Sequence, residues 1–140
     1  LSPYFIAIDQ YVQGVRALSA GDTSAAYAAL ANIGGADPIE TRSRRAMVPR
    51  LLHLELEGQI ELAAGNSGHA IELMEEAAQM EASVPPEYGP AQPVQPAAEL
   101  LADTYLSLGE HSLAAQNYEL SLKGYINRER SVMGLEKASE

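Results

Sequence analysis

The same residue types recur along this chain at steps of 44 residues, beginning with Gly21, Gly65 and Gly109. Four more sets keep this step: Gly14, Gly58 and Ala102; Leu18, Leu62 and Leu106; Ala26, Ala70 and Ala114; and, in two copies, Pro49 and Pro93. One recurrence can be chance, but five at one offset indicate a duplicated unit. Each copy predicts a helix, a turn at the glycine and a second helix. Units of this kind bury their apolar faces only by stacking on their neighbours.

The composition is that of a folded chain whose core is built from small and aliphatic side chains. The 140 residues are 46% hydrophobic and 20% charged, which is unlike a disordered segment. Tryptophan is absent and there is one phenylalanine, so alanine and leucine must do most of the packing. Cysteine is absent as well, which excludes disulfides and cysteine-ligated metal.

Periodicity and breakers place the helices. Apolar residues at helical spacing indicate a helix over residues 4–20, which Gly21 ends because a residue just past the last turn often needs positive φ. Pro49 predicts a kink or short break near Val48. Further helices are expected to end at about Ile33 and to span about 51–64, 68–82, 97–108 and 112–125.

Two segments lie outside this pattern. Residues 83–96 hold five prolines, which forbid a regular helix and favour an extended loop between repeats. Residues 127–138 are expected to form a last short helix with an apolar edge, which would suit it to cap the end of a stack of helices.

The copies resemble the tetratricopeptide repeat family, which places a small residue inside the first helix, Gly at the turn and Ala early in the second helix. The third copy matches best, with Leu101, Ala102, Tyr105, Gly109, Ala114 and Tyr118. The resemblance covers about 7–40, 51–84 and 95–128, and the C-terminal half is similar to bacterial repeat proteins. It implies an all-α, right-handed α-α superhelix of three helical hairpins plus a C-terminal capping helix, forming a single domain over residues 1–140. The family repeats every ~34 residues, so longer first helices or inserted loops must absorb about ten extra residues per step.

The resemblance also implies a concave groove, lined by the first helices, that holds a peptide or protein segment. The matching positions are Tyr11, Val15 and Leu18 in copy one, Glu55, Gln59 and Leu62 in copy two, and Glu99, Asp103 and Leu106 in copy three. This groove would be apolar at one end and acidic at the other, which suits a segment with apolar anchors and a Lys or Arg. Capture of a chaperone tail is disfavoured, because the matching positions offer no cation.

Charge narrows the classes of partner. The net charge is −10, and residues 51–122 contain no Lys or Arg, so a nucleic-acid surface is not expected. The negative electrostatic field of these acidic residues can attract a basic partner, or the residues can form a solvated surface without a binding role. A short basic cluster is formed by Arg42, Arg44 and Arg45. We expect these arginines either to form ion pairs with the neighbouring acidic helices, to contact an anionic lipid or acidic partner, or to join two copies of the chain. No apolar run reaches the ~18 residues of a membrane helix.

No arrangement typical of catalysis is found. Glu99 and Asp103 lie one helical turn apart and can share one face, but exposed acidic pairs are commoner than catalytic ones. His53 with Glu57 is a weak metal pattern without a third ligand. The sequence holds no Gly-x-Ser-x-Gly elbow, phosphate-binding loop or dinucleotide motif.

We therefore expect a protein–protein interaction scaffold, not an enzyme, with no cofactor and no metal. Two alternatives remain: a self-association module, or an accessory or regulatory domain of a larger enzyme or of a secretion or envelope complex. The chain begins at Leu1, which fits either an excised domain or a mature product. The partner and the compartment, cytoplasmic or periplasmic, stay open.

Overall fold

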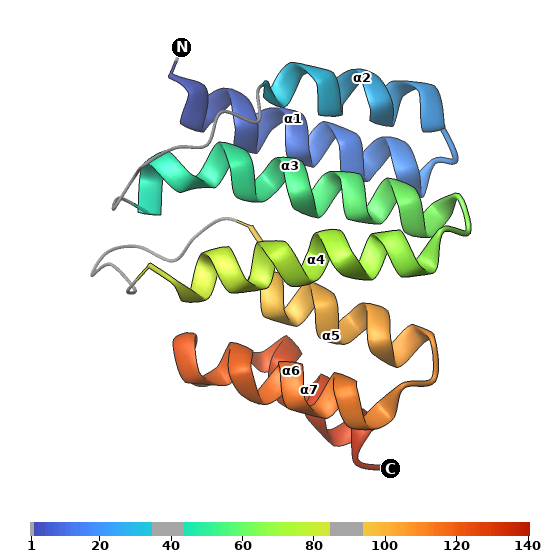
Figure 1. Ribbon diagram of the computed structural model, residues 1–140, viewed down its shortest axis with the longest axis vertical. Helices are drawn as coiled ribbons and strands as arrows, with labels where there is room; N and C mark the ends of the chain where they lie inside the picture. Colours follow the sequence, from blue (N-terminus) through green and yellow to red (C-terminus); the bar gives the residue numbers. More distant parts are fainter. Residues whose placement is uncertain (1, 35–43, 85–93) are drawn as a thin grey trace. The chain divides into compact units, whose positions relative to one another are not determined.

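The computed structural model describes residues 2–34, 44–84 and 94–140, and this part of the chain is all helical (Figure 1). The seven helices are α1 (Pro3–Ser19), α2 (Thr23–Ile33), α3 (Arg44–Ala63), α4 (Ser67–Ala82), α5 (Ala97–Ser107), α6 (His111–Gly124) and α7 (Glu129–Ala138). The predicted all-α class is confirmed, and three antiparallel hairpins, α1–α2, α3–α4 and α5–α6, occur at the 44-residue step.

One turn geometry closes all three hairpins. Gly21 takes φ 76°, its N–H donates to the Leu18 carbonyl at 3.0 Å, and the N–H of Asp22 donates to the Ala17 carbonyl at 2.8 Å. This pair of bonds is a Schellman motif, which needs a left-handed residue and therefore favours glycine. The same two bonds recur at Gly65 and Gly109, whose φ values are 88° and 78°. The duplicated glycines thus mark a duplicated turn.

Small residues let the helices approach closely. Ala26, Ala70 and Ala114, early in the second helix of each hairpin, are all 0% exposed. Gly14 does the same on α1, because a Cβ there would lie 2.6 Å from a methyl carbon of Leu56 on α3. The recurring alanines and glycines are therefore contact positions between helices.

The helices group into two compact units, Leu1–Glu87 and Tyr88–Glu140. In the first unit, α1 packs on α2 and α3, and α3 packs on α2 and α4. Its core is built around the fully buried Leu52, Leu54, Leu56, Ile60 and Met74. In the second unit, α6 and α7 pack together and both contact α5. The single domain and the right-handed superhelix stay predictions.

Of the kink or short break expected near Val48, the break is absent, since α3 runs without interruption through Pro49, and the kink stays a prediction. The proline is the sixth residue of the helix, so it removes one hydrogen bond close to the helix start and leaves later turns intact. Val48, Leu51 and Leu52 beside it are buried, and their packing offsets that loss.

The arginines around Pro49 bind within the first unit. Arg50 on α3 pairs with Glu76 on α4 at 3.2 Å. The guanidinium of Arg45 lies over the ring of Tyr4, 4.3 Å from its centroid, and 5.2 Å from that of Phe5. Arg42 and the side chain of Arg44 lie outside the described residues, as does most of the proline-rich segment 83–96.

The last helix, α7, matches the predicted cap and begins two residues later than expected. Asn127 has φ 64°, which is incompatible with a right-handed helix, so α7 starts after it. Gly134 faces Tyr118 of α6, and the hydroxyls of Ser131 on α7 and Ser121 on α6 are hydrogen-bonded at 2.9 Å. The helix is thereby held against α6 by close backbone approach.

Replacement of Gly134 tests this approach. A Cβ at this position would lie 2.3 Å from Cζ of the buried Tyr118 ring, so Gly134→Ala must displace α7 or the ring. We expect a loss of about 1–3 kcal/mol in the free energy of unfolding, measured by urea denaturation. Gly124→Ala is the matched control, since its Cβ meets nothing within 4 Å. Equal stability of the two variants would contradict the close packing described here.

Candidate functional site

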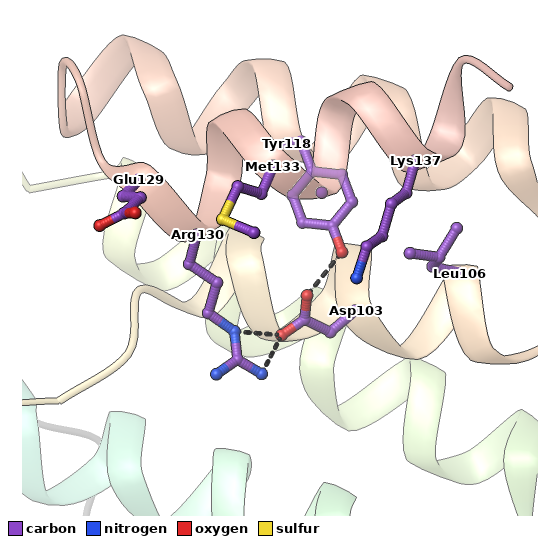
Figure 2. Close-up of a pocket in the computed structure, with 8 residues that line it drawn as sticks. Asp103, Leu106, Tyr118, Glu129, Arg130, Met133 and Lys137 are labelled. Atoms are coloured by element: carbon purple, nitrogen blue, oxygen red, sulfur yellow. Dashed lines mark hydrogen bonds and ion pairs between the residues drawn. The ribbon is translucent and has the colours of Figure 1, made fainter.

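A pocket of about 420 Å³ opens in the second unit between α5, α6 and α7 (Figure 2). It is lined by Asp103 and Leu106 of α5, Tyr118 of α6, and Glu129, Arg130, Met133, Gly134 and Lys137 of α7. Asp103 and Leu106 are two of the residues expected to line a groove. The structure thus places two of the three copy-three residues in one concavity.

Three side chains donate to the carboxylate of Asp103. The Tyr118 hydroxyl donates to one carboxylate oxygen at 2.5 Å, and Nε and Nη2 of Arg130 approach the other at 3.1 and 3.0 Å (Figure 2). The amide of Gln95 also donates to that second oxygen, at 2.7 Å. The charge of Asp103 is therefore compensated inside the second unit.

Glu99, one turn before Asp103, is fully buried at 0% exposure. Arg128 binds both of its carboxylate oxygens, at 2.6 and 2.9 Å, and the Ser131 hydroxyl donates to one of them at 2.5 Å. Burial alone would raise the pKa of Glu99, but the hydrogen bonds from Arg128 and Ser131 hold it below its usual range. Glu99 is thus an ionised anchor for the start of α7.

Gln95 links the two carboxylates. Its amide nitrogen donates to Glu99 at 3.0 Å and to Asp103 at 2.7 Å. The expectation that Glu99 and Asp103 share one helix face is confirmed. Both acids are engaged in holding α7, and this engagement leaves little of their charge for an external cation.

The pocket is lined by both apolar and charged side chains. Leu106, Met133 and the ring of Tyr118 form apolar surface, and Met133 is 51% exposed. The charged lining residues are Asp103, Glu129, Arg130 and Lys137, and Figure 2 shows the Lys137 side chain extending along the ring of Tyr118. Such a surface can take an apolar side chain and hydrogen-bond the backbone that carries it.

A second set of the expected groove residues meets in the first unit. Tyr11 of α1 is 7% exposed, and its hydroxyl accepts a hydrogen bond from the Gln59 amide of α3 at 3.0 Å. Burial, followed by the nearby carboxylate of Glu55, raises the pKa of the Tyr11 hydroxyl. Tyr11, Glu55 and Gln59 therefore lie together where α1 meets α3.

Glu55 is a fully buried carboxylate at 0% exposure. Neither of its oxygens has a hydrogen-bond partner in the part of the chain that the structure describes. Burial, and then the negative charge of Glu81 on α4, raise its pKa well above the usual value. Glu55 and Glu99 are both buried acids, but only Glu99 has donors that stabilise its charge.

The remaining groove candidates, Val15, Leu18 and Leu62, are partly exposed. The structure thus gathers Tyr11, Glu55 and Gln59 in one unit, and Glu99 and Asp103 with Leu106 in the other. A continuous groove across both sets stays a prediction.

The sequence reasoning missed the groups that α7 contributes, above all Arg128, Arg130, Met133 and Lys137. One signal was available. Arg128 and Arg130 lie two residues apart at the start of the expected cap, and Glu99 and Asp103 lie one turn apart on α5. Two cations facing two carboxylates indicate a docking contact, provided the cap folds back on the third hairpin.

The described residues show neither a metal-binding cluster nor a membrane-spanning helix. Across residues 2–34, 44–84 and 94–140, no three His, Asp or Glu side chains gather as a metal ion would need. His53 stands 3.7 Å from Glu57, and burial lowers its pKa. None of the described helices combines the length and apolar character needed to cross a bilayer.

Comparisons with models of known protein families, with curated proteins and with solved structures found no match to this chain.

Replacement of Arg128 tests the anchor at Glu99. Arg128→Met leaves a buried carboxylate without its cation, so we expect a loss of about 3–5 kcal/mol in the free energy of unfolding, measured by urea denaturation. Arg130→Met is the control, because Arg130 is 65% exposed and its loss should lower stability by about 1 kcal/mol or less. The double variant Glu99→Met/Arg128→Met should recover much of the loss, and similar values for both arginines would refute the anchor.

Glu55 should make stability fall as the pH rises. The folded chain keeps a proton on Glu55 that an ordinary glutamate releases near pH 4.5. This contribution is fully present below pH 4.5 and is lost on the way up to the raised pKa, by up to about 1.4 kcal/mol per pH unit. The stability of Glu55→Gln relative to the parent should therefore grow with pH, measured by urea denaturation between pH 4.5 and 8.

The control is Glu72→Gln, which removes one negative charge from the exposed side of α4. A constant difference between Glu55→Gln and the parent at every pH would show that Glu55 titrates as it does in the unfolded chain.

Proposed function

We propose that this chain is a protein-interaction module similar to tetratricopeptide repeat proteins, which binds a peptide or protein segment and catalyses no reaction. The three hairpins, each closed by the same turn at Gly21, Gly65 and Gly109, support a helical-repeat scaffold. We infer further that the hairpins continue into the right-handed superhelix that the repeat resemblance implies. Scaffolds of this kind present concave surfaces to their partners.

The observation that carries the proposal is the pocket between α5 and α7. Its apolar lining is formed by Leu106, Met133 and the ring of Tyr118, and the Asp103 carboxylate beside them is already bound by Tyr118 and Arg130. A segment that docks there gains most by burying an apolar side chain, because a cation on the segment would compete with Arg130 for Asp103. We therefore assign the pocket to an apolar anchor residue of the partner.

Charge adds attraction at longer range. With a net charge of −10, the chain draws basic segments toward it, which raises the rate of encounter more than the final affinity. The partner we propose thus has an apolar anchor and basic residues outside the pocket.

The test uses random peptides displayed on phage and selected on the wild-type chain, with binding then measured by fluorescence anisotropy. Met133→Glu replaces part of the apolar lining with a charge, and we expect the affinity of the selected peptides to fall by about tenfold or more, equal to about 1.4 kcal/mol. Val132→Glu is the matched control: it neighbours Met133 on α7, is 40% exposed and does not line the pocket.

Equal effects of the two variants would remove the pocket from the proposal. Failure to enrich any peptide on the wild-type chain would count against peptide binding itself.

A further inference from the structure

The outer side of α6 carries two exposed leucines. Leu113 and Leu120 are seven residues apart, so they lie on the same side of the helix, and they are 38% and 53% exposed. The buried side of α6 is formed by Ala114, Tyr118 and Ser121, and neither leucine lines the pocket. These leucines are surface that the second unit does not use for its own packing.

The repeat shows that this apolar surface is particular to the third copy. The position of Leu120 is held by Asn32 in copy one and by Glu76 in copy two. Both polar side chains contact the first helix of their own hairpin: Asn32 donates to Gln10 at 3.4 Å, and Glu76 pairs with Arg50 at 3.2 Å. Leu120 replaces such a polar contact with an exposed isobutyl group.

At the position of Leu113 the other two copies also have a smaller or a polar residue. It is held by Ala25 in copy one and by His69 in copy two, and His69 binds Glu61 of its own hairpin at 3.2 Å. Two substitutions of small or polar residues by leucine, on one side of one helix, make a patch that favours a partner.

The charge of α6 fits a second copy of this chain as the occupant. The helix holds one acidic residue, Glu119, and one basic residue, Lys123, so it has no net charge in a chain whose net charge is −10. Two copies that meet through α6 therefore bring no excess of like charge together at the contact.

We propose that two copies of this chain associate through the side of α6 that bears Leu113 and Leu120. The contact is isologous, because each copy offers the same leucines to the other around a two-fold axis. This interface is separate from the pocket and leaves it open, so the association goes beyond the proposed peptide binding and does not depend on it.

Sedimentation equilibrium over a range of concentrations tests the proposal. The wild-type mass should rise from 15.0 kDa toward twice that value as the concentration increases. Leu120→Glu installs the residue that copy two has at this position, and it should weaken the dimer by about tenfold or more in Kd. Tyr27→Glu is the matched control, since it adds the same charge at a residue of α2 that is 47% exposed, and it should dimerise as the wild type does.

Salt separates this dimer from one joined by ion pairs of the arginines with acidic helices. Association through leucines should persist or strengthen at high salt, whereas ion pairing is screened. Leu113→Lys provides a second variant, and circular dichroism confirms that each variant keeps its helices. A monomer at every concentration, a dimer that dissolves in salt, or an unchanged Kd for both leucine variants would overturn the proposal.

Discussion

Close approach of helix backbones is the constraint on which this structure depends. The chain has no tryptophan and one phenylalanine, so few large rings are available to fill space between helices. Ala26, Ala70 and Ala114 bring the second helix of each hairpin against the first, and Gly14 and Gly134 do the same between α1 and α3 and between α6 and α7. Dispersion contacts across such short distances replace the area that larger side chains would bury.

Two buried carboxylates, Glu99 and Glu55, differ in whether the surrounding helices supply donors that stabilise a negative charge. Glu99 receives hydrogen bonds from Arg128, Ser131 and Gln95, so its ionised form is stabilised and holds α7 in place. Glu55 is as deeply buried, but no described donor reaches its oxygens and Glu81 adds a like charge. One acid acts as a fixed structural element, whereas the other makes the first unit sensitive to pH.

The sequence predicted what local chemistry determines. Positive φ at Gly21 and the small side chain of Ala26 are signals confined to a few residues, and both could be placed before the structure was known. The ion pair of Glu99 with Arg128 could not, because it spans 29 residues and exists only when α7 folds back on α5. The short break considered at Pro49 is absent for a related reason: the penalty of a proline is local, but the buried neighbours that offset it are set by tertiary packing. The pocket depends on α7 as well, which is why only Asp103 and Leu106 were found in advance.

The repeated Schellman turn has a consequence for how the chain folds. Each hairpin closes through a few residues around its glycine, so most contacts join segments that are near in sequence, and little loop entropy is lost when they form. Chains with such low contact order fold within microseconds to milliseconds, and any of the three hairpins can nucleate the process. The helices also group into two compact units, and each can unfold as a cooperative unit of its own when the protein is heated.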